Sequence, residues 1–389
     1  MDNYAEIYKS ELLNEVVPFW EQYSVDQKYG GYFTCITNKG VVYDTDKFMW
    51  LQARQIWMFA TLYQKVKPND AWKKMALHGA DFLESHGRDT GGNWYFSLNQ
   101  HGAPLVQPYN IFSDCFAAMA FSALHQIEPL AKYEQIAKST FQNILNRRGN
   151  SKGKYNKVYP GTRNLQNFAL PMILCNLSLE MEPILGSDTV QEVTQSVIDL
   201  IMNNFYQAQS GLVLENVSDE GKFVDSFEGR LLNPGHAIEA MWFIMNLGLR
   251  NKDYDLVKKA EQIMYQQLEH GWDQEYGGIF YFMDYKGHPP QQLEWDQKLW
   301  WVHLETLVAL AKTYAWNKSP KAEAWFKRVH NYTWTHFRDK ENGGEWYGYL
   351  NREGKVSLNL KGGKWKGCFH VPRALLEIWK TLEKVTENK

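Results

Sequence analysis

Several histidine, glutamate and arginine residues stand inside segments that are otherwise apolar. The segment NPGHAIEAMWFI, residues 233–244, has the features of a helix start, because Asn233 is a favourable N-cap and Pro234 a favourable first residue. His236 and Glu239 follow three residues apart, so a helix places them on the same side. An imidazole, with an ordinary pKa of about 6.5, exchanges protons near neutral pH. This helix start is therefore a candidate for acid/base chemistry.

Comparable polar residues occur in three other apolar segments. Arg54 lies in WLQARQIW, a segment with no other charge. The segment LEWDQKLWWVHLETLVAL places Trp301 and Glu305 four residues apart, on one face of a helix. In KGCFHVPRALLEIW, His370 stands just ahead of a helix that we expect to begin at Pro372.

Each of these residues also has a purely structural interpretation. A single histidine near a helix start is more often a hydrogen-bonded structural group than a catalyst. Glu305 could form an ion pair with Arg54, and Trp301 could belong to the core. His303 lies on another face from Glu305 and is expected to be structural or to support the site. Burying several charged groups without a use would cost several kcal/mol each, so their joint placement favours a functional site.

A repeated glycine motif indicates how these segments are arranged. Four similar segments begin with an acidic residue and contain a Gly-Gly pair: DQKYGGYF from Asp26, DTGGNWYF from Asp89, DQEYGGIF from Asp273 and DKENGGEW from Asp339. Each is typical of a tight hairpin that enters a strand, where glycine supplies a positive φ. Two further glycines fill the gap and give a near-constant spacing of 61, 62, 58, 66 and 66 residues for the series Gly30, Gly91, Gly153, Gly211, Gly277 and Gly343. Such a period indicates a repeated supersecondary unit.

Two helical patterns usually lie between successive glycine motifs. The first is apolar nearly all round and the second carries charge on one face, which predicts one buried and one amphipathic helix per repeat. About twelve helices in six pairs predict an all-α fold, an (α/α)6 barrel with short β-hairpins in the loops at one end; an open helical solenoid is the alternative. No linker divides the chain, so residues 1–389 are predicted to form a single catalytic domain. The polar residues at the inner helix starts would then face the mouth of a funnel.

Composition excludes several classes of protein. The net charge of −2 and the lack of a long basic run argue against nucleic-acid and membrane-surface binding. No apolar run of membrane-spanning length and no signal peptide is present, so a cytoplasmic location is expected. The four cysteines form no CxxC pair, which argues against a zinc site. The basic segment KGGKWKG, residues 361–367, is expected to be a solvated loop rather than an anion site.

The longer segments resemble a known family, the N-acylglucosamine 2-epimerases, which in mammals are also called renin-binding proteins. The resemblance runs over essentially the whole chain and is strongest in RQIWMFATLY, LENVSDEGK, NPGHAIEAMWF, QLEWDQKLWWVHLE and REGKVSLNLKGGKWKGCFHVPR. It implies an (α/α)6 barrel, frequently a homodimer, that interconverts N-acetylglucosamine and N-acetylmannosamine in amino-sugar or sialic acid metabolism. It also implies that ATP or another nucleotide acts as an effector. Cellobiose 2-epimerases and aldose–ketose isomerases share a sparser form of the same motifs.

The resemblance also implies roles for individual residues. His236 and His370 match the two acid/base histidines of the family. The other matching positions line the sugar pocket, with Trp242 as a further contact: Arg54, Glu239, Trp301 and Glu305. Inverting a carbon beside a carbonyl needs one proton-transfer group on each face, which two histidines provide. Arg54 would stabilise the negative charge that develops on O1 or O2. No metal or redox cofactor is required for this chemistry.

Three alternatives remain open at this stage. The chain could be an epimerase or isomerase of another aldose, of the cellobiose 2-epimerase or mannose isomerase type. It could be an inverting glycoside hydrolase that uses Glu239 and Glu305 as acid and base, although this leaves both histidines without a role. It could also be a binding protein without enzymatic activity.

Overall fold

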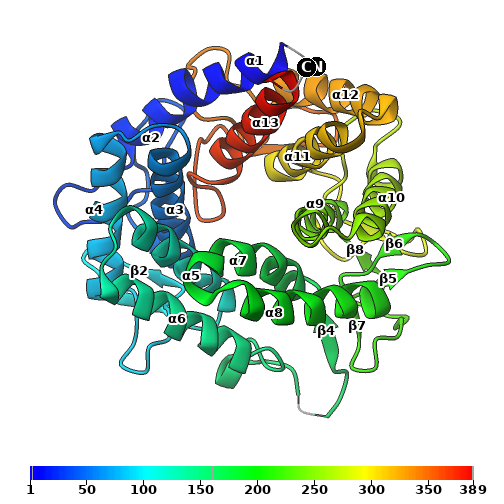
Figure 1. The fold of residues 1–389 in the computed structure, drawn as a ribbon, viewed down its shortest axis with the longest axis horizontal. Coiled ribbons are helices and arrows are strands. Elements are labelled where there is room, and N and C mark those ends of the chain that lie inside the picture. The colour runs from blue at the N-terminus through cyan, green and yellow to red at the C-terminus, as the bar shows by residue number, and fades with distance from the viewer. Residues whose placement is uncertain (2, 160, 388–389) are drawn as a thin grey trace.

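The helices form two concentric rings in the computed structural model, which describes residues 1, 3–159 and 161–387 (Figure 1). The inner ring consists of α3 (Met49–Lys65), α5 (Ile111–Ile127), α7 (Ala169–Leu185), α9 (Pro234–Asn251), α11 (Trp300–Asn317) and α13 (His370–Glu387). The outer ring consists of α1 (Tyr4–Glu11), which continues through a π-helical segment (Leu12–Val16) into α2 (Val17–Tyr23), then α4 (Asp70–His86), α6 (Ala131–Asn146), α8 (Ser187–Leu200), α10 (Tyr254–Gly271) and α12 (Pro320–His336).

The two rings differ in the way that the sequence patterns predict. From Leu51 to Leu62 every residue of α3 is buried, because this inner helix has neighbours on all sides. The outer helix α10 buries Val257, Ala260, Met264 and Leu268, three or four residues apart, and turns its charged face to solvent. Most of the hydrophobic core therefore lies between the rings and among the inner helices.

The ring is closed, which distinguishes the barrel from an open solenoid. Helix α13 packs against α11 on one side and against α1, so the beginning and the end of the described chain lie together (Figure 1). On its other side, the rings of Trp57 on α3 and Phe369, the residue before α13, have centroids 5.4 Å apart. The prediction of an (α/α)6 barrel is confirmed.

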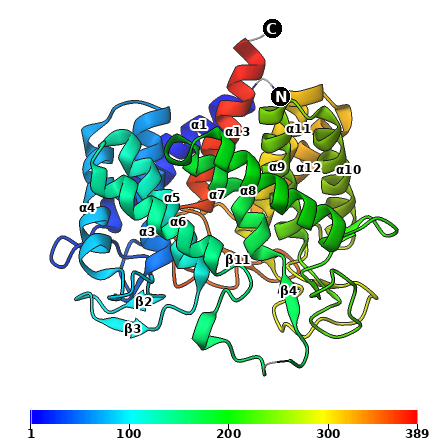
Figure 2. The same ribbon diagram turned by 60° about the horizontal axis from the view of Figure 1, so that its bottom comes forward.

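Long loops connect each outer helix to the next inner helix and gather at one end of the barrel (Figure 2). They contain short strands: β1 (Lys47–Phe48), β2 (Ser97–Leu98), β3 (Pro104–Val106), β4 (Leu165–Asn167), β5 (Tyr206–Gln207), β6 (Leu212–Val213), β7 (Asn216–Ser218), β8 (Leu231–Leu232), β9 (Met283–Asp284), β10 (Lys298–Leu299) and β11 (Tyr349–Leu350). Four strands directly precede inner helices, namely β1, β4, β8 and β10. Each pairs antiparallel with a strand of the next loop: β1 with β2, β4 with β7, β8 with β9 and β10 with β11. Neighbouring repeats are thus joined at the loop end.

The four Gly-Gly motifs form turns, but among the described residues only DTGGNWYF leads directly into a strand, β2. A single bridge closes three of the turns: Val25 with Tyr32, Arg88 with Trp94, and Trp272 with Ile279. The expected positive φ occurs at Gly30 (82°), Gly277 (75°) and Gly343 (65°). In the DTGG turn it falls on Gly92 (81°) instead of Gly91.

The two glycines that complete the repeat have different environments. Gly211 lies in the true hairpin between β5 and β6, as predicted. Gly153 begins a short 3-10 helix (Gly153–Tyr155), so the prediction of a hairpin there is wrong.

A buried ion pair fixes three of the turns to the chain that leads into an inner helix. In each pair an aspartate at the start of the turn contacts a lysine farther along, and both side chains are at most 2% exposed: Asp26–Lys47 (2.8 Å), Asp273–Lys298 (2.9 Å) and Asp339–Lys361 (2.9 Å). The same aspartates accept hydrogen bonds from backbone N–H groups of their own turns. Each pair therefore anchors a loop at the barrel mouth.

The basic segment 361–367 differs from both predicted forms. Lys361 contacts Asp339, and Lys366 contacts Glu345 at 2.7 Å with only 2% of its side chain exposed. Both lysines are buried ion-pair partners, so the predicted solvated loop is wrong for them, and no anion site is formed by them. Within the described residues, no helix combines the length and the apolar character needed to cross a membrane.

Candidate active site

A cavity of about 480 Å³ lies among the inner helices, lined by their N-terminal residues and by the loops. Five of the residues predicted to form the site line it: Arg54 on α3, His236 and Glu239 on α9, Trp301 on α11 and His370 on α13. These residues are up to 316 positions apart in the sequence. The ring arrangement brings them together because each stands within the first two turns of an inner helix.

His236 is positioned by the start of α9 and by a carboxylate. The Asn233 side chain accepts a hydrogen bond from the backbone N–H of His236 at 3.1 Å, which confirms Asn233 as the N-cap and Pro234 as the first helical residue. The Nδ1 atom of His236 lies 3.1 and 3.2 Å from the two carboxylate oxygens of Glu215. Because a carboxylate only accepts hydrogen bonds, Nδ1 carries the proton and Nε2 is the nitrogen left for a substrate.

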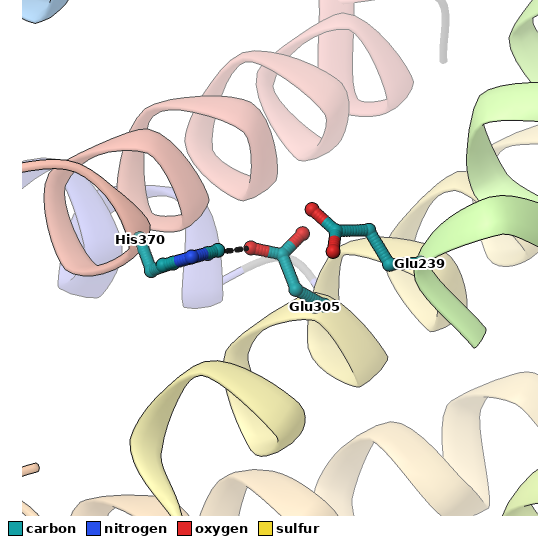
Figure 3. A group of neighbouring side chains, drawn as sticks. All are labelled: Glu239, Glu305 and His370. Atoms are coloured by element: carbon teal, nitrogen blue, oxygen red, sulfur yellow. Dashed lines mark hydrogen bonds and ion pairs between the residues drawn. The ribbon is translucent and has the colours of Figure 1, made fainter. Parts of the chain in front are cut away.

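His370 is held in the same manner by a different carboxylate. Its Nδ1 lies 2.8 Å from Oε1 of Glu305, to which it donates (Figure 3). His370 is itself the first residue of α13, so Pro372 is the third helical residue and not the first as predicted. Each histidine thus has a carboxylate on Nδ1, an arrangement that fixes the ring and its tautomer.

Trp301 lies next to both imidazoles. Its ring centroid is 5.2 Å from that of His236 and 5.9 Å from that of His370, with an interplanar angle of 36° in both cases. The two histidine rings can be no farther apart than the sum of these distances. Both line the same cavity, so one bound molecule can contact both.

Arg373 links the two glutamates below the cavity. Its Nη2 atom lies 2.5 Å from Oε1 of Glu239 and 2.6 Å from Oε1 of Glu305. Figure 3 shows the carboxylates of Glu239 and Glu305 facing each other, with His370 beyond Glu305. Single ligand atoms of these three residues lie within 4.8 Å of one another, as in a metal site. Here the guanidinium of Arg373 supplies the positive charge between the carboxylates.

Arg54 has no hydrogen bond or ion pair with any other described residue. It is only 7% exposed, and its guanidinium carbon lies 3.9 Å from the ring centroid of Phe116 and 4.4 Å from that of Phe369. Its Nε is buried without an acceptor. The structural interpretation of Arg54 as the ion-pair partner of Glu305 is therefore wrong, because Arg373 takes that place. The donors of Arg54 are free for an oxygen atom of a ligand.

The surroundings shift the pKa values of the two histidines in opposite directions. Burial lowers the pKa of His370 well below its ordinary value, and the positive charges of Arg54 and Arg373 lower it further. Burial also lowers the pKa of His236, but the charge and hydrogen bond of Glu215 outweigh this and leave it raised. At pH values between these two pKa values, a neutral His370 lies beside a protonated His236.

The charged groups beneath the histidines are also perturbed. Burial raises the pKa of Glu305, although Arg373 and Trp242 oppose this shift. Burial and the neighbouring Arg373 lower the pKa of Arg54 to about 9, which leaves it protonated at neutral pH. The floor of the cavity thus has a free cation close to a neutral imidazole.

Two predicted site residues lie behind the cavity instead of lining it. Glu305 is fully buried and reaches the cavity only through His370. Trp242 is 2% exposed, and its indole Nε1 donates to Oε2 of Glu305 at 3.1 Å. This position does not support the predicted contact of Trp242 with a sugar; the residue holds Glu305 in place. His303 is buried, donates to the Leu299 carbonyl and accepts from the Ile279 N–H, as expected of a structural residue.

Sequence reasoning missed two residues that hold the site together. Glu215 ends the apolar run GLVLE, and an acid at the end of such a run was the available signal. Arg373 follows His370 by three residues in an apolar helix, with the same spacing that singled out His236 and Glu239. Both residues act by positioning groups that line the cavity.

The geometry argues against an inverting glycoside hydrolase. Such enzymes hold their two carboxyl groups about 6.5–9.5 Å apart to leave room for a water molecule. Here Glu239 and Glu305 each place an oxygen within 4.8 Å of the other and bind one Arg373 nitrogen, and Glu305 does not line the cavity. The two carboxylates therefore have the wrong spacing and exposure for that reaction.

Comparisons with known proteins agree with the geometry. The family model described as N-acylglucosamine 2-epimerase (GlcNAc 2-epimerase) matches residues 31–374. The chain is 39% identical to N-acylglucosamine 2-epimerase of Rattus norvegicus over 93% of its length and 88% of the relative's, and 36% identical to that of Homo sapiens over 93% and 86%.

Solved structures share the fold at lower identity. The cellobiose 2-epimerase of Bacillus thermoamylovorans superposes with a TM-score of 0.85 at 19% identity, covering 98% of this chain and 100% of that one. A D-mannose isomerase gives a TM-score of 0.82 at 20% identity, with coverage of 97% and 98%. On the strength of the matched family model and the relatives of 36–39% identity, this chain belongs to the N-acylglucosamine 2-epimerase family.

Proposed function

We propose that this protein interconverts N-acetylglucosamine and N-acetylmannosamine by moving a proton at C2 of the ring-opened sugar. The observation that carries the proposal is the pair of imidazoles, His236 on α9 and His370 on α13, which line one cavity and both lie next to Trp301. Each is held through Nδ1 by a buried carboxylate, so each can present Nε2 to the same carbon atom. The relatives named N-acylglucosamine 2-epimerase support the choice of sugar.

The reaction follows from the acidity of a C–H bond beside a carbonyl. Opening of the pyranose ring exposes an aldehyde at C1. One imidazole takes the C2 proton; the C–H electron pair forms a double bond between C1 and C2, and negative charge moves to O1. The imidazolium on the other side then gives its proton to C2 from the opposite face, and the carbonyl forms again. The sugar gains and loses one proton, so the reaction needs no oxidant or reductant.

Arg54 is the group that we expect to stabilise the intermediate. Its guanidinium is buried at the cavity and has no protein acceptor among the described residues, so an oxygen that gains negative charge can accept its hydrogen bonds. A donor already in place costs no reorganisation when the charge develops, and removing one such donor typically costs about 2.7–4 kcal/mol of transition-state stabilisation. Glu239 and Glu305, bridged by Arg373, hold the floor rigid.

Solvent isotope exchange tests the chemistry directly. Incubating N-acetylmannosamine with the protein in D₂O should give N-acetylglucosamine that carries deuterium at C2, as measured by NMR after separation of the epimers. His236→Asn and His370→Asn should each abolish epimerisation while leaving the helical circular dichroism unchanged. His288→Asn is the matched control, because this histidine is exposed in a loop and the variant should keep full activity. Full activity of either site variant would remove that histidine from the mechanism.

The same assay separates the remaining alternatives. Faster turnover of mannose or cellobiose than of N-acetylmannosamine would identify an aldose epimerase or isomerase of another specificity. No turnover of any of these sugars, together with binding, would identify a protein without enzymatic activity.

The proposal extends to the setting in which the enzyme works. By its resemblance to the family, we infer a cytoplasmic homodimer that serves amino-sugar and sialic acid metabolism and is stimulated by ATP as an effector, not as a reactant. Sedimentation analysis tests the dimer. Assays with and without ATP test the stimulation, and intact ATP should be recovered after turnover.

A further inference from the structure

The order of the inner helices around the ring defines the directions open to a bound sugar. His236 on α9 and His370 on α13 stand on either side of α11, and α5 lies across the ring from α11 (Figure 1). If C2 lies between the two histidines, the other substituents of C2 project across the line that joins them. They can extend toward the floor, toward the mouth or toward α5 and α7, because Trp301 occupies the side of α11.

The α5–α7 side of the cavity contains only apolar side chains, and unlike the α11 side it is not occupied by the large rings of Trp300 and Trp301. Helix α5 contributes Phe112 and Phe116, one turn apart, and α7 contributes Ala169, Met172 and Ile173 at positions i, i+3 and i+4. Phe112 and Ile173 are partly exposed and line the cavity. In contrast, α3, α9 and α13 each contribute a charged or imidazole group.

Polar substituents have suitable partners on the other sides. Arg54 offers free donors at the floor, which suits O1. Glu294, Gln297 and Tyr349 line the cavity from the loops and suit the hydroxyl groups of C3 to C6. The wall of Phe112, Phe116, Ala169, Met172 and Ile173 offers nothing to a hydroxyl group.

We propose that this apolar wall is the subsite that receives the acyl group on the C2 nitrogen. The inference rests on the function proposed above. Arg54 marks the edge of the subsite, since its guanidinium packs on the ring of Phe116 at 3.9 Å. An acyl group at this edge can direct its carbonyl oxygen to Arg54 while its methyl group packs against Met172 and Ile173.

Substrates of different acyl length test the subsite. The readout is kcat/KM for deuterium exchange at C2 in D₂O, measured with N-acetylmannosamine, N-propanoylmannosamine and mannose. In the wild-type protein, kcat/KM for N-acetylmannosamine should exceed kcat/KM for mannose by about 10–200-fold, the usual value of a small apolar contact. Ile173→Ala removes volume from the wall and should raise the propanoyl-to-acetyl ratio by about 10-fold or more.

A control variant separates a change of acyl specificity from a general loss of activity. Trp365→Phe alters a residue that lines the cavity outside the wall. It should change kcat/KM for all three substrates by the same factor. If Ile173→Ala fails to fold, Ile173→Val and Met172→Leu make smaller changes of the same wall, and each should still alter the ratio.

The possible outcomes distinguish the two proposals. A wild-type enzyme that turns over N-acetylmannosamine, with wall variants that leave the acyl ratio unchanged, would overturn the acyl subsite and leave the proposed function intact. A wild-type enzyme that exchanges mannose but not N-acetylmannosamine would overturn the proposed function itself.

Discussion

Replacing Glu215 by glutamine should move one limb of the pH profile and leave the other in place. Glu215 contacts Nδ1 of His236 through both carboxylate oxygens, at 3.1 and 3.2 Å, and is 5% exposed. Glutamine keeps the size and can still accept the hydrogen bond, but it removes the negative charge. The substitution therefore tests the electrostatic effect of Glu215 on His236 apart from its role in packing.

The size of the effect follows from the burial and the contact distance. An opposite charge within about 4–6 Å typically shifts a pKa by about 1–3 units, and one unit corresponds to about 1.4 kcal/mol. Glu215 is the main cause that raises the pKa of His236, against a lowering by burial. Without it, the pKa of His236 should fall by about 1–3 units.

The direction in which the pH profile moves follows from the protonation state that the reaction needs. One imidazole must be neutral and the other protonated, and the structure favours neutral His370 with protonated His236. This state exists above the lowered pKa of His370 and below the raised pKa of His236. Activity is lost on the alkaline side when His236 loses its proton, so in Glu215→Gln the alkaline limb of kcat/KM should move to lower pH by about 1–3 units.

The assay is the pH profile of kcat/KM for N-acetylmannosamine epimerisation in the wild-type protein and in Glu215→Gln. Glu305→Gln is the matched control, because it makes the same chemical change at the other histidine and Glu305 forms no hydrogen bond with His236. Its alkaline limb should stay in place. An alkaline limb that is unchanged in Glu215→Gln, whatever the loss of rate, would refute the assignment of Glu215 as the group that keeps His236 protonated.

Two further predictions concern the buried ion pairs. Arg373→Gln leaves Glu239 and Glu305 without their shared cation and should lower the free energy of unfolding by about 3–5 kcal/mol, measured by chemical denaturation, whereas Arg373→Lys should recover part of it; equal stability of the two variants would contradict this. Lys47→Met, which leaves Asp26 unpaired, should lower the free energy of unfolding by about 3–5 kcal/mol. Lys298→Met should lower it by less, because Arg352 still contacts Asp273, the partner of Lys298, at 3.1 Å. The opposite order would show that Arg352 does not compensate.

Local signals in the sequence were sufficient for the alternation of inner and outer helices and for the start of α9, although they placed the start of α13 two residues too late. The apolar periodicity separated inner from outer helices, and Asn233 with Pro234 located the first residue of α9. The repeat then placed Arg54, His236 and His370 at equivalent positions of different inner helices. These features depend on neighbours within one or two turns, which the sequence displays directly.

Depth along the barrel could not be predicted in the same way. Trp242 lies six residues beyond His236 on α9, about 9 Å farther from the mouth at 1.5 Å per residue. The level of the cavity floor depends on which side chains of other helices fill the centre, and here Arg373 and Glu305 do so. For this reason Trp242 and Glu305 lie behind the cavity although they share helices with residues that line it.

Local sequence patterns also could not show which charged groups form ion pairs or which strands pair with each other. Arg54 and Arg373 are both cations at inner helix starts, and only the packed ring shows that Glu305 contacts Arg373 and leaves Arg54 free. Strands β1, β4, β8 and β10 likewise pair with a strand of the next loop instead of with a local hairpin partner, which the Gly-Gly turns did not indicate.

The position of α13 has a consequence for biosynthesis. Ribosomes make Glu239 and Glu305 long before Arg373 and His370, which come 134 and 65 residues after them, respectively. Until that last helix emerges, the nascent polypeptide holds two carboxylates in its interior without their cation and has only one imidazole of the pair. A prematurely terminated product that stops before residue 370 would therefore be both unstable and inactive. The order of synthesis keeps the active site incomplete until the ring of helices can close.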